Sequence, residues 1–375
     1  MPLSGKSAST KPLHQPDATL PPLDIPHLSL IAGGVTTLLL CLWIALTHNW
    51  HGHWSLDHTH GIQKTHLNPT PRIGGVAILL GGVVGWWLSP RLVDTQLGMI
   101  LLASLPAFAF GFAEDLTRRV GVRERLLATM ASGLLAWWLS GISLTRVDIW
   151  GIDTLLAWVP ISVIFTAFAV GGIANAINII DGFNGLAAGV VLICLSSLGF
   201  IAFYAGDPVM AKVCFVLGGV TAGFLVINFP FGKIFLGDGG AYLLGFWLAW
   251  IAVLIAMRNP NISPWSSLLA CAYPIVEVLF SVYRRRRRNH HPGHPDRLHL
   301  HSLIKSRITR KRMTSSSLTM KNAAVSPYLW CLAAFPALLA PLLRNHTSWL
   351  MLAFVGFFAL YYSCYVALVR FAIKR

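Results

Sequence analysis

The residues best suited to chemistry lie in a short polar stretch that follows an apolar run. Asn175, Asn178 and Asp181 are spaced three residues apart, so neighbouring members share a face if the stretch is helical. They follow the apolar run 155–173. An ionisable group at bilayer depth costs at least about 2.5 kcal/mol and usually has a functional reason. The alternative is a polar helix end capped by Asn and Asp, but the cost of the carboxylate favours a functional site.

A pair of adjacent carboxylates marks a second candidate position. Glu114 and Asp115 directly follow another apolar run. Together they could hold a divalent cation through oxygen ligands, or one of them could accept a proton. An ordinary helix end with salt bridges to Arg118 and Arg119 explains the pair equally well. On the pair alone, both interpretations stay open.

A third carboxylate, Asp238, lies among glycines in the sequence Gly-Asp-Gly-Gly, before a helix expected to start near Ala241. Glycines let the backbone approach a ligand closely, and a helix N-terminus favours anions. The position therefore suits a metal–diphosphate site, and Phe235 could stack on a base. The same four residues are also a common turn.

Cationic residues that could bind a diphosphate occur in two segments. Arg72 lies at the mouth of an expected helix that opens with two glycines, and Lys64 precedes it in the same loop. A guanidinium group there can bind phosphate in a bidentate way, or it can simply anchor the helix on the cytoplasmic side. Arg297, His299 and His301 are spaced two apart, which suits a loop or short strand presenting one face. Such side chains would form a diphosphate clamp.

The elements that must position these residues are transmembrane helices. Of the 375 residues, 55% are hydrophobic and only 11% are charged, against about 25% charged in soluble globular proteins. The chain is therefore expected to be an all-α, polytopic integral membrane protein. We expect eleven spans, at about 28–47, 73–89, 97–113, 126–142, 155–173, 185–205, 211–229, 241–257, 264–283, 328–343 and 348–370.

Basic residues predict the orientation of these spans, because cytoplasmic loops carry an excess of Lys and Arg. One set of loops, together with the end of the chain from Arg370, holds 22 of the 29 basic residues. These loops are 48–72, 114–125, 174–184, 230–240 and 284–327. The N-terminus is therefore expected outside and the C-terminus in the cytoplasm, and every candidate residue above is expected on the cytoplasmic face. The net charge of +15 reflects this bias, so we expect no nucleic-acid partner.

Taken in order, the polar motifs resemble those of one family, the polyprenyl-phosphate N-acetylhexosamine-1-phosphate transferases. The most specific part is Asn175-x-x-Asn178-x-x-Asp181-Gly followed by Phe235-x-Gly-Asp238. The resemblance runs from about Lys64 to Ile304. It implies a single membrane-embedded transferase domain at 28–375, with its active site on the cytoplasmic face. Residues 1–27 are polar, with several Pro, Ser and Thr residues, so we expect a flexible tail there.

Two loop motifs resemble the undecaprenyl-phosphate N-acetylglucosamine-1-phosphate transferase branch, which starts O-antigen-like polysaccharides. They are the His-x-x-Pro-Thr-Pro-Arg-Ile-Gly-Gly segment at 66–75 and the Pro-Asp-Arg-x-His-x-His segment at 295–301. The phospho-MurNAc-pentapeptide branch typically has adjacent histidines in the second loop. The chain departs from the family in having Glu114 where Asp is usual, and Ser302 where a third histidine is common.

The resemblance implies a reaction, its substrates and a location. Undecaprenyl phosphate would attack the β-phosphorus of a UDP-N-acetylhexosamine and release UMP, with Mg²⁺ as cofactor and Mn²⁺ as an alternative. Phosphoryl transfer of this kind depends on positioning two anions and neutralising their charge. The protein would lie in a bacterial inner membrane, in contact with membrane lipid. The identity of the amino sugar and the existence of a homodimer stay open.

The same resemblance implies roles for individual residues. It implies catalytic Asp115, Asp181 and Glu114, metal-binding Asp238 and Asn178, nucleotide-binding Asn184, Asn228 and Phe235, and phosphate- or sugar-binding Lys64, Arg72, Arg297, His299 and His301. The main alternative is a transporter or lipid flippase, because carboxylates at membrane depth and broken helices suit that class too. The clustering of motifs on one face and the lack of an inverted repeat argue against it.

Overall fold

The computed structural model describes residues 27–57, 69–287, 298–309, 313 and 315–370, and most of this part is helical. The helices are α1 (His27–Leu46), α2 (His48–Ser55), α3 (Gly74–Trp87), α4 (Arg91–Thr117), α5 (Val122–Ser140), α6 (Ile152–Leu156), α7 (Val159–Ile180), α8 (Leu186–Tyr204), α9 (Pro208–Asn228), α10 (Gly237–Arg258), α11 (Pro264–Ala270), α12 (Ala272–Arg287), α13 (Leu300–Ile304), the π-helix η1 (Lys305–Thr309), α15 (Leu318–Ala323), α16 (Val325–Leu342) and α17 (Thr347–Arg370). Two short strands, β1 (Leu56–Asp57) and β2 (Thr70–Pro71), pair antiparallel. The expected all-α fold is confirmed.

The expected count of eleven spans is not confirmed. Among the described residues, eight helices are long and apolar enough to cross a membrane, and α11 with α12 would make a ninth span with a bend of 78°. The other two expected spans correspond to α3 and α5. α3 has 14 residues, so it is about 21 Å long, shorter than the hydrocarbon core of about 30 Å. α5 begins with three charged residues within its first turn. The chain is a multi-pass membrane protein.

Several expected loops are shorter than predicted, because helices continue past their most apolar residues. α7 extends to Ile180, so Asn175 and Asn178 lie in its last turns and Asp181 follows as its C-cap residue. α10 begins at Gly237 rather than near Ala241. Apolar composition marks the part of a helix suited to hydrocarbon, whereas the backbone hydrogen bonds continue into the polar flanks.

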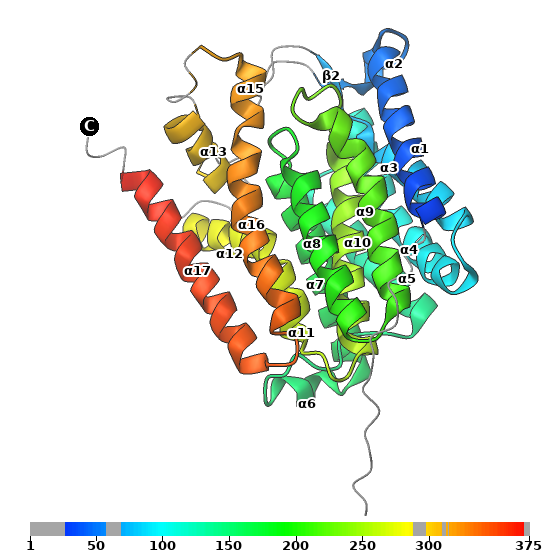
Figure 1. Ribbon diagram of the computed structural model, residues 1–375, viewed down its shortest axis with the longest axis vertical. Helices are drawn as coiled ribbons and strands as arrows, with labels where there is room; N and C mark the ends of the chain where they lie inside the picture. Colours follow the sequence, from blue (N-terminus) through cyan, green and yellow to red (C-terminus); the bar gives the residue numbers. More distant parts are fainter. Residues whose placement is uncertain (1–26, 58–68, 288–297, 310–312, 314, 371–375) are drawn as a thin grey trace, which may run out of the picture.

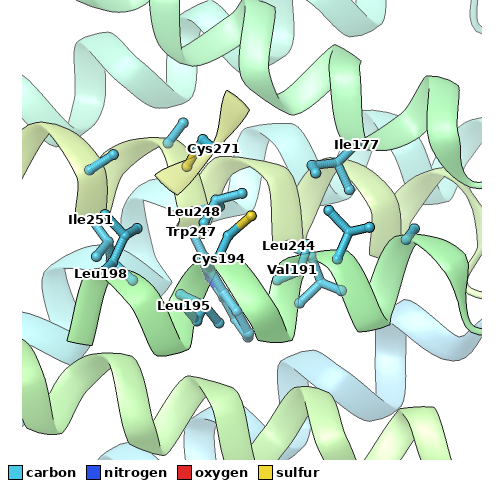
Figure 2. Packing of buried hydrophobic residues seen from close by; sticks show 14 of the residues in the cluster. Ile177, Val191, Cys194, Leu195, Leu198, Leu244, Trp247, Leu248, Ile251 and Cys271 are labelled. Atoms are coloured by element: carbon cyan, nitrogen blue, oxygen red, sulfur yellow. The ribbon is translucent and has the colours of Figure 1, made fainter. Parts of the chain in front are cut away.

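The most buried helix is α10, which packs against α3, α4, α7 and α8. Its large side chains, such as Trp247 and Trp250, are almost fully buried. Figure 2 shows Trp247 and Leu248 beside Cys194 and Leu195 of α8. A helix that is apolar on all sides belongs in the interior, so α10 provides a fixed support for whatever its N-terminus carries.

Glycines let three helices meet at the N-terminus of α10. A Cβ atom on Gly75 of α3 would collide with the backbone of Gly240. A Cβ atom on Gly111 of α4 would lie 2.6 Å from the backbone oxygen of Asp238. At Gly237 the φ angle is +74°, a conformation that glycine adopts easily. The backbones of α3, α4 and α10 are therefore in direct contact around Asp238.

The predicted gathering of polar segments at one face agrees with the structure. Figure 1 shows α2, β2 and α15 at one end of the helix bundle and α6 at the other. Contacts described below join 69–72, 114–125, 175–184, 230–240 and 298–305 at the first of these ends.

Candidate active site

Asp238 lies at the centre of a cluster contributed by four separate segments. Its Oδ1 atom accepts a hydrogen bond of 3.1 Å from Nδ2 of Asn178, at the end of α7. Nη2 of Arg72 lies 3.4 Å from the same oxygen, and Arg125 of α5 forms an ion pair with Oδ2. The side chain of Asp238 keeps 17% of its surface exposed. The structure therefore brings together both residues predicted to bind metal, and adds two guanidinium groups.

Asp115 holds this cluster in place through hydrogen bonds to the backbone of α10. Its Oδ1 and Oδ2 atoms accept hydrogen bonds of 2.8 Å from the backbone N–H groups of Asp238 and Gly239. Those donors belong to the first turn of α10 and have no partner within the helix. Nη2 of Arg72 lies 2.9 Å from Oδ1 of Asp115, which is buried. Asp115 thus caps α10, where its negative charge also interacts favourably with the helix dipole, and holds Arg72.

The carboxylate of Glu114 makes its hydrogen bond outside the Asp238 cluster. Its Oε2 atom accepts a hydrogen bond of 2.8 Å from the backbone N–H of Val120, in the connection between α4 and α5. Arg118 in this connection adopts a left-handed conformation, with φ at 55°. The two neighbouring carboxylates therefore serve different elements, and Glu114 stabilises the turn that leads to Arg125.

Asp181 is a further acidic residue near the cluster. Its carboxyl group is largely enclosed by protein although the residue keeps some exposed surface, and this burial raises its pKa to about 7, against the opposing effect of the Arg72 guanidinium group. A carboxyl group with a pKa near neutrality can exchange a proton or, when ionised, bind a cation.

The oxygen ligands around Asp238 suit Mg²⁺ only if the substrate supplies further ligands. Among the described residues, no three His, Cys, Asp or Glu side chains gather closely enough to hold a metal ion. Mg²⁺ commonly binds through one or two carboxylates together with substrate phosphates and water. Asp238, with the amide of Asn178 rotated to present its oxygen, fits that pattern.

Two of the residues predicted to bind nucleotide tie loops together. Asn228 accepts a hydrogen bond from the backbone N–H of Gly185 and donates one of 2.7 Å to the backbone oxygen of Ile234. Asn184 donates a hydrogen bond of 3.0 Å to the backbone oxygen of Pro230. These bonds join the α7–α8 turn to the α9–α10 loop, and they use the side-chain amide of Asn228 on both sides.

A cavity of about 720 Å³ opens beside this loop junction. Asn184 and Phe235 both line it, with Thr70, Phe231 and Lys233. Asn228 is not among its lining residues. The backbone of Phe235 bonds to Pro71, next to Arg72, so the cavity and the Asp238 cluster share one wall.

The described part of the predicted histidine motif, residues 299–301, packs on the turn after Asp181 and is called the histidine segment below. The rings of His299 and His301 are stacked, with centroids 5.1 Å apart, and the His301 ring lies 5.3 Å from that of Phe183. Lys305 of η1 places its ammonium group 5.5 Å from the same phenyl ring. Two other predicted clamp residues, Lys64 and Arg297, lie outside the described residues.

The sequence interpretation missed several residues that the structure connects to this region. Arg125 counted only as part of a basic segment. Tyr242 of α10 donates a hydrogen bond of 3.4 Å to Asn175 and lies beneath the Arg125 guanidinium group. Glu277, inside an apolar run, accepts a hydrogen bond from His299, and Tyr361, inside another, donates a hydrogen bond to Glu277. A lone carboxylate such as Glu277 in an apolar run was a usable signal, because such groups are expensive there.

Comparisons with known proteins identify the family. The profile of glycosyl transferase family 4 matches residues 97–256. Decaprenyl-phosphate N-acetylglucosaminephosphotransferase of Mycobacterium leprae (strain TN) is 30% identical over 275 residues, which cover 64% of this chain and 67% of that protein. The protein of the same name from Mycobacterium tuberculosis (strain ATCC 25618 / H37Rv) is also 30% identical, and the match spans 66% of its length.

A second group of relatives carries undecaprenyl phosphate in its name. Undecaprenyl-phosphate alpha-N-acetylglucosaminyl 1-phosphate transferase of Yersinia pestis is 26% identical over 308 residues, covering 80% of this chain and 82% of that protein. These names give no support to a transporter or flippase. With the motif order and the glycosyl transferase match, they show that the chain belongs to the polyprenyl-phosphate N-acetylglucosamine-1-phosphate transferase family.

Proposed function

We propose that the protein transfers N-acetylhexosamine 1-phosphate from a UDP-sugar to undecaprenyl phosphate and releases UMP. The observation that carries the proposal is the cluster of Asp238, Asn178, Arg72 and Arg125 at the N-terminus of α10. It combines a carboxylate that can hold a divalent cation with two guanidinium groups that can bind phosphate. The names of the relatives support the same reaction and favour N-acetylglucosamine as the sugar.

In this reaction an oxygen of the lipid phosphate forms a bond to the β-phosphorus of the donor. The bond from that phosphorus to the oxygen bridging the two phosphates breaks, and UMP leaves with the electron pair. Both reactants are anions, so the protein has to reduce their repulsion and align them. Arg72 and Arg125 are placed to do so, because each guanidinium group has five donors and can contact phosphate while it still pairs with Asp238.

The metal and the remaining acidic residues have separate tasks in the proposal. Bound Mg²⁺ would be held by Asp238 and Asn178 and would neutralise charge on the diphosphate. Asp115 keeps α10 and Arg72 in place. Asp181, whose pKa is raised to about 7, is suited to take a proton from the acceptor phosphate or to join the metal ligands.

The nucleotide is proposed to occupy the cavity lined by Asn184, Phe235, Phe231 and Lys233. Its volume of about 720 Å³ lies within the range of roughly 300–1,000 Å³ usual for small-molecule sites. Phe235 and Phe231 can stack on the base, and Lys233 adds a positive charge. Because the cavity adjoins the segment carrying Arg72, a uridine placed there would direct its phosphates toward Asp238.

The setting of the reaction is part of the same proposal. The protein is proposed to act at the cytoplasmic face of a bacterial inner membrane and to begin the synthesis of an O-antigen-like cell-surface polysaccharide. The excess of basic residues in the loops that carry the site supports the cytoplasmic face.

The test is an assay of the purified protein with UDP-N-acetylglucosamine, undecaprenyl phosphate and Mg²⁺, in which UMP and the lipid product are both measured. Turnover should depend on all three components, and chelation of the metal should stop it. Replacing the donor by other UDP-N-acetylhexosamines identifies the sugar. Absence of UMP with every such donor, in a folded and detergent-stable preparation, would refute the proposal.

A further inference from the structure

A buried carboxylate lies outside the cluster just described. Glu277 of α12 is fully buried, and its two oxygens accept three hydrogen bonds. Oε2 accepts one of 2.7 Å from the hydroxyl of Tyr361 in α17. Oε1 accepts one of 2.9 Å from Nδ1 of His299 and one of 3.3 Å from the backbone N–H of Leu300. Two of the three bonds hold the histidine segment.

The second ring nitrogen of His299 determines which tautomer is present. Nη2 of Arg285 lies 3.3 Å from Nε2 of His299. A guanidinium group can only donate hydrogen bonds, so Nε2 must accept and carries no hydrogen. The hydrogen is therefore on Nδ1, where it points at Glu277. Both ring nitrogens of His299 are thus engaged by protein groups, which leaves this residue poorly placed to bind the donor diphosphate itself.

His299 is connected to the active site through its neighbour. Its ring stacks on that of His301 with an angle of 10° between the planes. His301 meets the ring of Phe183 edge-on, and its Nε2 atom lies 3.6 Å from the position that a Cβ atom on Gly182 would take. Gly182 directly follows Asp181 in the chain. The orientation of His299 therefore sets the surface that faces the turn carrying Asp181.

We infer that Glu277 is a positioning residue of the active site, which fixes the tautomer and orientation of His299 and so places His301 beside the Asp181 turn. Purely structural anchoring does not require a charge, because apolar packing anchors helices at lower cost than a buried ion. Here the Glu277 charge acts on Nδ1–H of His299 and on the backbone N–H of Leu300, and these two groups determine the orientation of the histidine segment. Partners that orient a metal-ligating histidine typically affect activity by about 10–100-fold, and we expect an effect of the same order here.

The charges around Glu277 are consistent with this role. Arg284, two helical turns further along α12, places its guanidinium group 5.8 Å from the Phe280 ring and 5.4 Å from the Tyr365 ring. Arg285 contacts His299 directly. Arg285 therefore links the end of α12, the helix that carries Glu277, to the histidine ring that Glu277 orients.

The test compares Glu277→Gln with the unmutated protein by two measurements. Nitrogen-15 NMR of labelled histidine in detergent micelles, with His299→Gln identifying the signal, reports the tautomer. Steady-state kinetics gives KM and kcat for each substrate, and this part rests on the proposed function. In Glu277→Gln we expect loss of the uniform Nδ1–H state and a fall of about 10–100-fold in kcat/KM for UDP-N-acetylglucosamine, with the KM for undecaprenyl phosphate nearly unchanged.

Asp207→Asn is the matched control. Asp207 is also a buried carboxylate, which caps α9 and pairs with Arg258, and within the described part of the chain its partners lie away from the histidine segment. It should lower thermal stability without changing the His299 tautomer or the donor KM. Tyr361→Phe, which leaves the Glu277 charge in place, should fall between the control and Glu277→Gln in donor kcat/KM.

Two results would overturn the inference. One is an unchanged histidine spectrum in folded Glu277→Gln. The other is a loss of activity that is equal for both substrates and matched by Asp207→Asn, which would indicate general destabilisation. An unmutated protein that binds UDP-N-acetylglucosamine but forms no UMP would contradict only the proposed reaction. The tautomer and the donor affinity of Glu277→Gln would then still decide the role of Glu277.

Discussion

At the scale of single residues, the carboxylate of Asp238 is the point where the site's charges meet. It has two guanidinium neighbours, and Arg72 is shared with Asp115. An anionic diphosphate that enters this region meets cations already oriented by carboxylates. Such preorganisation lowers the cost of stabilising charge in the transition state.

Asp238→Asn should reduce UMP formation by at least about 10²–10³-fold, the range seen when a preorganised electrostatic group is lost. The variant keeps the shape of the side chain but removes the charge that Arg72, Arg125 and a metal ion would use. UMP release at saturating Mg²⁺ is the measurement. Asp148→Asn is the control, because Asp148 pairs with Arg146 in a different part of the structure. Full activity in Asp238→Asn would remove Asp238 from the site.

The adjacent carboxylates should respond differently to substitution. In Asp115→Asn a donating NH₂ group replaces an oxygen that accepts bonds from the first turn of α10. Loss of hydrogen bonds to a charged group costs about 1.5–3 kcal/mol. We therefore expect a clear loss of both activity and thermal stability.

Glu114→Asp should keep most of its activity, because the hydrogen bond that Glu114 accepts lies in the α4–α5 turn and not in the Asp238 cluster. Measuring kcat/KM and the melting temperature of both variants in parallel gives the comparison. If Glu114→Asp were the more damaging change, the roles assigned to the two carboxylates would have to be exchanged.

The sequence was sufficient to predict which residues meet, but not every role they take. Arg72, Asn178 and Asp238 were predicted at one face, because motif order and the positive-inside rule place them together. The capping of α10 by Asp115 could not be predicted, since it depends on how closely α4 and α10 pack. Glu277 was read as part of an apolar run. Hydropathy averages over a window, so it conceals one carboxylate whose partners come from distant segments.

At the scale of elements, the contact between α3 and α10 holds the site to close tolerance. Gly75 and Gly240 meet backbone to backbone, with no room for a Cβ atom. Backbone cannot move aside as a flexible side chain can. The position of Arg72, just before α3, relative to Asp238 in α10 is therefore set by glycine packing.

Gly75→Ala should consequently separate α3 from α10. Overpacking of this kind costs about 1–3 kcal/mol, and a displacement of about 1 Å in a catalytic group can cost 10²-fold in rate. Gly172→Ala in α7 is the matched control, since among the described residues no atom beyond its own stretch of helix backbone lies within 4 Å of the Cβ atom it would gain. Alanine there should be neutral or stabilising, because glycine inside a helix costs about 0.5–1 kcal/mol. Equal activity in both variants would show that the α3–α10 contact tolerates adjustment.

At the scale of the whole molecule, the meeting of the polar segments does not depend on the number of spans. Direct contacts join Arg72, Asp115, Asn178 and Asp238. Which side of the membrane they face rests on the distribution of basic residues. The membrane side of these residues also depends on whether the short α3 and the α5 helix with its charged first turn each cross the membrane. The orientation is therefore tested directly below.

Reporter fusions after Arg125 and after Arg288 should both report the cytoplasm. A fusion after Arg258, at the end of α10, should report the outside and serves as the internal control. The expectation follows from the 22 basic residues in one set of loops against 7 in the other. An outside signal at Arg125 or Arg288 would mean that the orientation or the span count is wrong.

The hydrogen bond from Tyr361 to Glu277 also has a consequence for the timing of biosynthesis. Tyr361 follows Glu277 by 84 residues, which a ribosome adds in roughly 4 to 17 s at 5–20 residues per second. During that interval the Asp238 cluster can already have assembled from α3, α4, α5, α7 and α10, while the histidine segment lacks an anchor that α17 supplies. A nascent chain would thus acquire its charged centre before its histidine segment is fixed, and the complete arrangement would form only after α17 has been inserted.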